Sequence, residues 1–128
     1  MTLDRQVVNA SAAPAAVGPY SHAVRAGELL ICSGQIPLDP ATGEIVGDTP
    51  GEQAERCLQN LSAVCHAAGT SLARAVRLTV YMTDMGAFAE VNERYERFFA
   101  GEYPARVAIG VAALPRGAQV EIDAIVAL

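Results

Sequence analysis

Six stretches of this chain have the alternating or continuously apolar character of strands. They are residues 4–8, 21–25, 29–34, 73–82, 105–113 and 118–127. The second and third flank the turn-forming Ala26-Gly27-Glu28 and therefore predict a hairpin. The last two flank Leu114-Pro115-Arg116-Gly117 and predict a second pair of neighbouring strands.

Two other stretches have apolar residues at the helical spacing. In the first, Thr49 can serve as the N-cap and Gly69 as the C-terminal stop, which predicts a helix over residues 50–68. In the second, Thr83 or Asp84 can cap a helix that runs to about Phe99.

The order of these elements is βββ-α-β-α-ββ, which predicts a single α+β domain over residues 1–128 with both helices on one face of the sheet. A sheet covered on one side only should show a polar second face. The stretch 107–113 is apolar on both faces. We therefore expect a second subunit to cover the face that the helices leave open.

Composition supports this expectation. Hydrophobic residues make up 52% of the 128 residues and charged residues only 18%, which is more apolar surface than a small monomer needs. No apolar run approaches the roughly 20 residues that span a bilayer, and the N-terminal residues lack the apolar core of a signal peptide. We expect a cytoplasmic protein with no membrane partner.

Charge and reactive side chains exclude several classes of function. All nine basic residues are arginines, so Schiff-base chemistry through a lysine is excluded. The net charge of −5 and the lack of a basic stripe disfavour nucleic-acid binding. The three cysteines show no CxxC spacing, His22 and His66 are isolated, and no phosphate loop or dinucleotide motif is present. We expect no metal and no cofactor.

The most informative residue is Arg106, which interrupts an apolar strand. Burying a guanidinium costs several kcal/mol unless an anion answers it. Glu121 or Asp123 can be that anion in a structural pair, or a ligand can supply a carboxylate. If the final turn is symmetric, Glu121 lies opposite Gly110 and shares a face with Arg106, ~13 Å away. That geometry predicts a polar cavity with a cation at one end and a carboxylate at the other.

Other polar residues are weaker candidates. Tyr20 follows Gly18-Pro19 at a turn and presents a hydroxyl, although a core tyrosine is the simpler interpretation. Ser33-Gly34-Gln35 ends a strand, where a hydroxyl and backbone N–H groups can face a ligand or make an ordinary turn. Asn92 is a polar residue within the second helix and is equally compatible with a surface role.

These motifs, in this order, resemble those of the Rid/YjgF family of reactive-intermediate deaminases over nearly the whole chain. The resemblance is carried by Gly18-Pro19-Tyr20-Ser21, Ser33-Gly34-Gln35-Ile36-Pro37, Thr42-Gly43, Asn92 with Tyr95 and Phe98-Phe99, Pro104-Ala105-Arg106, Leu114-Pro115 and Val120-Glu121-Ile122.

The resemblance implies a chorismate-mutase-like fold, a homotrimer with clefts between subunits, and cofactor-free hydrolysis of 2-imino acids and their enamine tautomers to 2-oxo acids and ammonia. By the same resemblance, Arg106 would hold the substrate carboxylate and Glu121 would position or activate water. Tyr20, Ser33, Gly34 and Asn92 would line the cleft. Ala108, whose backbone N–H would remain available, replaces the cysteine of many relatives, so a catalytic thiol is impossible there.

Two alternatives remain open at the level of sequence. One is a non-catalytic trimer that binds a small carboxylate. The other is an endoribonuclease, an activity attributed to some relatives, against which the acidic net charge argues.

Overall fold

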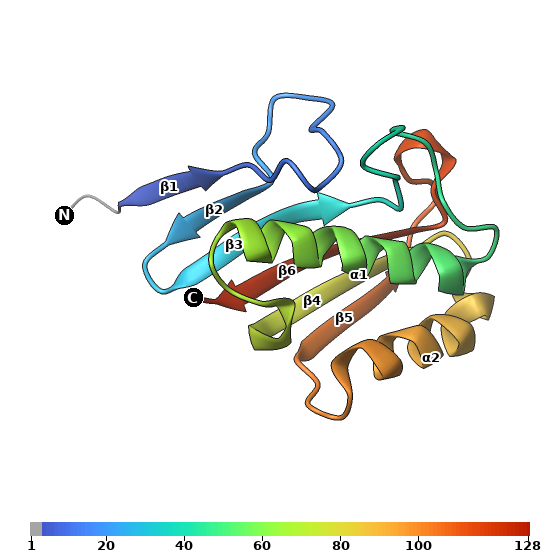
Figure 1. Ribbon diagram of the computed structural model, residues 1–128. Helices are drawn as coiled ribbons and strands as arrows, with labels where there is room; N and C mark the ends of the chain where they lie inside the picture. Colours follow the sequence, from blue (N-terminus) through green and yellow to red (C-terminus); the bar gives the residue numbers. More distant parts are fainter. Residues whose placement is uncertain (1–3) are drawn as a thin grey trace.

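The computed structural model of the protein describes residues 4–128 and shows one six-stranded mixed sheet with both helices on the same face (Figure 1). The α+β prediction is confirmed. The strands are β1 (Arg5–Val8), β2 (Ala23–Ala26), β3 (Leu29–Gln35), β4 (Ala75–Met82), β5 (Ala105–Gly110) and β6 (Val120–Ala127). The α-helices are α1 (Pro50–Ala67) and α2 (Phe88–Phe99), and the 3₁₀ helices are η1 (Leu72–Arg74), η2 (Met85–Ala87) and η3 (Pro115–Gly117).

Helix α1 begins and ends where its sequence signals predict. The Thr49 side chain accepts a hydrogen bond from the N–H of Glu52 at 3.2 Å, which satisfies one of the unpaired donors of the first turn. The helix stops before Gly69, whose φ of +81° lies in the left-handed region. Leu58 and Leu61 on its inner face are fully buried against the sheet.

Helix α2 begins later than the sequence predicts. Oδ1 of Asp84 accepts a hydrogen bond from the N–H of Gly86 at 2.8 Å, but this cap opens the 3₁₀ turn η2, and the α-helix proper starts at Phe88. The C-terminal end agrees with the prediction, since Ala100 and Gly101 both adopt positive φ values after Phe99.

The predicted pairing of the last two strands is wrong. The strand order is β1-β2-β3-β6-β4-β5, so β4 lies between β5 and β6 (Figure 1). The physical reason is the α2 crossover, which returns the chain parallel to β4 on its outer side, leaving the inner edge of β4 for β6. The predicted hairpin of β2 and β3 is confirmed.

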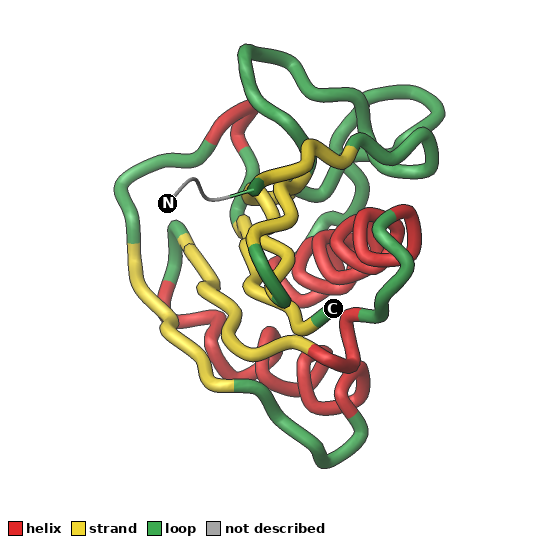
Figure 2. The backbone as a smooth tube through the Cα atoms, turned by 90° about the vertical axis from the view of Figure 1, so that its left-hand side faces the viewer, coloured by secondary structure: helices red, strands yellow, loops and turns green. Residues whose placement is uncertain are grey.

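The core lies between the helices and one face of this sheet (Figure 2). Alternate residues of β6 point to that core, and the residues between them point to the open face. On the open face of β5, Val107 and Ile109 are 40% and 41% exposed. That another subunit covers this face stays a prediction. No helix within residues 4–128 has both the length and the apolar character that crossing a membrane requires.

Candidate functional site

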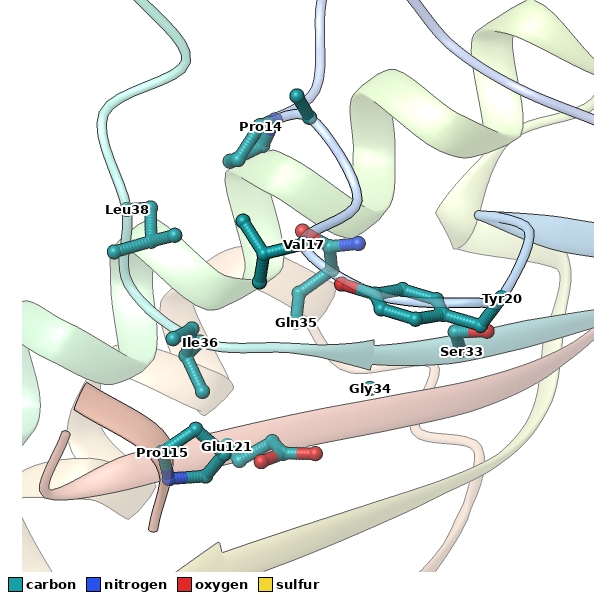
Figure 3. Close-up of a pocket in the computed structure, with 11 residues that line it drawn as sticks. Pro14, Val17, Tyr20, Ser33, Gly34, Gln35, Ile36, Leu38, Pro115 and Glu121 are labelled. Carbon is teal, nitrogen blue, oxygen red and sulfur yellow. The ribbon is translucent and has the colours of Figure 1, made fainter. Parts of the chain in front are cut away.

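A cavity of about 480 Å³ opens where β3 ends beside β6 (Figure 3). It is lined by Pro14, Ala15, Val17, Tyr20, Ser33, Gly34, Gln35, Ile36, Leu38, Pro115 and Glu121. Three segments that are distant in sequence therefore bring together four of the predicted site residues, namely Tyr20, Ser33, Gly34 and Glu121. Apolar side chains form most of the remaining wall.

A β-bulge shapes the floor of this cavity. Across β3 and β6, Cys32 pairs with Ala124 and Gln35 pairs with Ile122, so two residues of β3 lie opposite one residue of β6. The two residues of β3 at this bulge are Ser33 and Gly34. Such an insertion bends the strand and redirects its side chains. The Ser33 hydroxyl then donates to the backbone oxygen of Ser21 at 2.6 Å and remains able to accept a hydrogen bond from a ligand.

Gly34 is needed because the Glu121 side chain lies directly over it (Figure 3). A Cβ atom at position 34 would overlap Oε2 of Glu121 and lie 3.0 Å from its Cδ. The absence of a side chain therefore gives the Glu121 carboxylate its place in the cavity.

The segment that carries Tyr20 is held by His22, a buried residue. Nδ1 of His22 accepts from the N–H of Ala10 at 2.9 Å, and Nε2 lies 2.7 Å from the backbone oxygen of Pro14. Because a carbonyl can only accept, Nε2 carries the proton. His22, at the end of the loop that leads to the cavity, thus binds the first part of the same loop. Figure 3 shows the Tyr20 ring reaching across towards Gln35.

Glu121 lies in surroundings that favour its neutral form. Partial burial raises the pKa of its carboxyl above the usual value, and the nearby negative charge of Asp123 raises it further. Glu121 is half-buried and lines the cavity, so its carboxylate remains accessible from there. A carboxyl of this kind is suited to taking a proton from water and giving it back.

Arg106 lines a second, separate cavity of about 370 Å³, where it is exposed and not buried as its place in an apolar strand suggested. Its guanidinium carbon is 5.2 Å from the ring centre of Phe88 and 4.8 Å from that of Tyr95, both on α2. Nη1 of Arg106 donates to Oδ1 of Asn92 at 2.7 Å. Within residues 4–128 the ion pairs are Arg94–Glu55 and Arg97–Glu93, so no carboxylate of the described chain neutralises Arg106.

The prediction that Arg106 and Glu121 share a face is wrong. Leu78 on β4 is in register with Arg106, whereas Tyr81 on the same strand is in register with Glu121. Positions 78 and 81 are an odd number of residues apart and point to opposite faces. Arg106 therefore lies on the helix-covered face and Glu121 on the open face. The error follows from the pairing of the last two strands described above.

The two remaining predicted site residues, Asn92 and Ala108, lie in different surroundings. Asn92 lines the cavity of Arg106 and binds the guanidinium. Ala108 is in register with Val80 and packs against the core, and it is not among the residues that line either cavity.

The aromatic rings that hold Arg106 and the apolar wall around Glu121 were not predicted from the sequence. Phe88, Asn92 and Tyr95 recur at the spacing of one helix face, which is a usable signal once Arg106 is known to face α2. The Ser33–Gly34 bulge has a weaker signal, a glycine inside a strand. Among residues 4–128 no three His, Cys, Asp or Glu side chains come together as metal ligands would.

Comparison with known proteins places this geometry in a family. Residues 10–128 match the family model described as Endoribonuclease L-PSP. The chain is 52% identical over 121 residues to the RutC family protein y4sK of Sinorhizobium fredii, covering 94% of this chain and 96% of that protein. It is 46% identical to the 2-iminobutanoate/2-iminopropanoate deaminase of Mus musculus, covering 94% of this chain and 90% of that protein.

The fold agrees with solved structures of such proteins. The crystal structure of E. coli TdcF with bound serine superimposes with a TM-score of 0.91 at 40% identity, covering 96% of this chain and 98% of that one.

Proposed function

Because the chain belongs to the Endoribonuclease L-PSP family, which is the Rid/YjgF family that its motifs resemble, we propose that it is a hydrolytic deaminase of reactive 2-imino acids. Its substrates are of the 2-iminobutanoate/2-iminopropanoate type, with their enamine tautomers, and its products are 2-oxo acids and ammonia. The relative from Mus musculus named above supports this reaction.

The observation that carries the proposal is the state of Arg106. Its guanidinium is oriented by two aromatic rings and one amide, yet no carboxylate of the described chain pairs with it. A planar fork of donors held in this way matches a substrate carboxylate bidentately. Serine, which the related E. coli TdcF structure contains, is a small molecule with such a carboxylate.

The site is completed between subunits of a homotrimer. Arg106 and Glu121 lie on opposite faces of one sheet, so a single copy cannot present both to one small substrate. A closed symmetric assembly repeats one contact, in which the Arg106 side of each copy meets the Glu121 cavity of the next. The exposed Val107 and Ile109 supply apolar surface for that contact.

The reaction needs orientation and proton transfer. Arg106 holds the carboxylate, and Glu121 accepts a proton as water adds to the imine carbon. Glu121 returns this proton to the nitrogen, which gives a carbinolamine. Glu121 then takes the remaining proton of the new hydroxyl group and delivers it to the nitrogen, so that the C–N bond breaks, ammonia leaves, and the C=O bond of the 2-oxo acid forms. Tyr20, Ser33 and the backbone at Gly34 orient substrate and water, while Asn92 and the strand carrying Ala108 fix Arg106.

The wild-type protein and its Arg106 and Glu121 variants also test two other functions. A non-catalytic trimer would bind a small carboxylate through Arg106 without turning it over. An endoribonuclease is suggested by the description of the matching family model, but a chain with no lysine and a net charge of −5 offers little to neutralise RNA phosphates.

The deciding experiment is a coupled assay. An amino-acid oxidase generates 2-iminopropanoate or 2-iminobutanoate while semicarbazide competes for the imine. The wild type should suppress semicarbazone formation and Arg106→Ala should not. Glu121→Gln should lower turnover by about 10²–10⁴, the range of general base catalysis. Arg97→Ala, which removes an exposed arginine of the same region, should behave as the wild type.

The results that would contradict the proposal exclude different parts of it. If Glu121→Gln keeps full activity, Glu121 is not the base. If the wild type is inactive on a broad panel of imines, the deaminase is excluded, and calorimetry with a 2-oxo acid then tests the binding module. RNA cleavage that Arg106→Ala abolishes would favour the endoribonuclease.

A further inference from the structure

A hydrogen-bonded pair of side chains lies beside Glu121 on the open face of the sheet. The Tyr81 hydroxyl of β4 donates to Oδ2 of Asp123 on β6 at 2.9 Å. Tyr81 is also the residue of β4 in register with Glu121. Glu121 and Asp123 are two positions apart on one strand, so both carboxylates and the phenol point the same way, with the carboxylates' Cα atoms ~7 Å apart.

This arrangement brings two negative groups together without a cation from their own chain. The ion pairs within residues 4–128 involve neither Glu121 nor Asp123. A flexible Asp123 would turn towards solvent to avoid its neighbour. The Tyr81 hydroxyl opposes that movement, because a hydrogen bond to a carboxylate is stronger than one between neutral groups.

We propose that Tyr81 and Asp123 are a positioning pair, in which the Tyr81 hydroxyl fixes the Asp123 carboxylate beside Glu121 and thereby sets when Glu121 binds a proton. The inference rests on the proposed function for its role in catalysis. Asp123 is not among the residues that line the cavity, and it acts through Glu121.

Among the groups of its own chain, Asp123 is the main charged influence on Glu121. Tyr20 lines the cavity from the loop before β2, and β3 contributes only its uncharged bulge. Tyr81 lies beside Glu121 on the neighbouring strand β4. Cys57 of α1 lies beneath the sheet, hydrogen-bonded to the backbone of β6. The charge of Asp123 raises the pKa of Glu121 in addition to the effect of burial.

The pair matters because Glu121 must hold each transferred proton between taking it up and handing it on. It takes a proton from the attacking water and returns it to the leaving nitrogen. A carboxyl with its ordinary pKa gives that proton to solvent too readily for the second step. A fixed neighbouring charge holds the proton longer without neutralising the group at the start of the cycle.

The test follows the ¹³C signal of the Glu121 side-chain carboxyl by NMR through a pH titration of the whole protein. In Asp123→Asn the titration midpoint should move to lower pH, because a charge that opposes ionisation has been removed. Glu28→Gln, which removes an exposed carboxylate from the β2–β3 turn, is the matched control and should leave the midpoint unchanged. The acid limb of the kcat/KM profile should move in the same direction.

Tyr81→Phe tests the pair itself. Without the hydroxyl, Asp123 is free to turn away, so Asp123→Asn should shift the Glu121 midpoint less in the Tyr81→Phe background than in the wild type. Equal shifts in both backgrounds would remove Tyr81 from the pair, and no shift beyond that of Glu28→Gln would overturn the proposal. Because the NMR midpoint does not depend on turnover, a failed deaminase assay leaves this test intact.

Discussion

Gly34 shows how one missing side chain governs the candidate site. In Gly34→Ala the new methyl group would occupy the position of the Glu121 carboxylate, so Glu121 must turn away. We expect turnover to fall nearly as far as in Glu121→Gln, with a loss of about 1–3 kcal/mol in the free energy of unfolding from overpacking. Kinetics on the single and double variants check this, since Gly34→Ala should cost little further activity in the Glu121→Gln background. Additive losses would contradict it.

The ionised carboxyl of Glu121, which the proposed reaction requires, should lower the stability of the fold. Its folded-state pKa is raised above the ordinary value of 4.5, so the unfolded chain ionises more readily than the folded one. The ionised carboxyl therefore destabilises the fold above the folded-state pKa, and this penalty disappears as pH falls below 4.5. Thermal unfolding should show a higher Tm for Glu121→Gln at neutral pH and a vanishing gain in acid. A gain that persists unchanged in acid would contradict the assigned cause.

At the scale of elements, α2 acts as the platform for Arg106. Phe88, Asn92 and Tyr95 are separated by four and three residues, so one face of the helix presents a ring, an amide and a second ring to the guanidinium. The amide binds Arg106 without neutralising it. This difference between an amide and a carboxylate leaves the positive charge for a ligand.

The substitution Asn92→Asp should therefore weaken substrate binding at Arg106. The new carboxylate would pair with Arg106 permanently and compete with the substrate carboxylate, so KM should rise by about tenfold or more. Asn92→Ala, which removes the amide without adding charge, should raise KM less. Steady-state kinetics on both variants, with circular dichroism as the check on folding, decide the matter. An Asn92→Asp enzyme with the KM of Asn92→Ala would show that Arg106 does not bind the carboxylate.

Local elements could be predicted from the sequence because their signals are local. Thr49 and Gly69 mark the ends of α1 by capping chemistry, and the turn around Gly27 marks the first hairpin. The partner of β6 has no such signal, since it depends on where the α2 crossover delivers β5. The motifs pointed to four residues that line the cavity, namely Tyr20, Ser33, Gly34 and Glu121. The prediction that Arg106 and Glu121 share a face depended on the strand pairing and was wrong.

At the scale of the whole molecule, the proposed site belongs to a contact between copies. Each copy carries one half of it on the helix-covered face and the other half on the open face. Mixing two inactive variants, Arg106→Ala and Glu121→Gln, should therefore restore activity once subunits exchange. Random mixing leaves about a quarter of the contacts with both groups intact, so about a quarter of wild-type activity should return.

The control for this mixture is the double variant Arg106→Ala/Glu121→Gln mixed with either single variant, which can form no intact contact. Native mass spectrometry confirms that subunits have exchanged. Exchange without recovered activity would place both groups of the working site within one chain and contradict the proposed assembly.

The position of β6 also determines when this protein can fold. β6 is the strand that joins β3 to β4, and every other strand is synthesised before it. Until β6 has left the ribosome, β1–β3 and β4–β5 are separate fragments with unpaired edges, and α1 has only part of its packing surface. Folding is therefore delayed until β6 has been synthesised. Until then, the unpaired strand edges can pair with other chains unless a chaperone binds them or folding follows quickly.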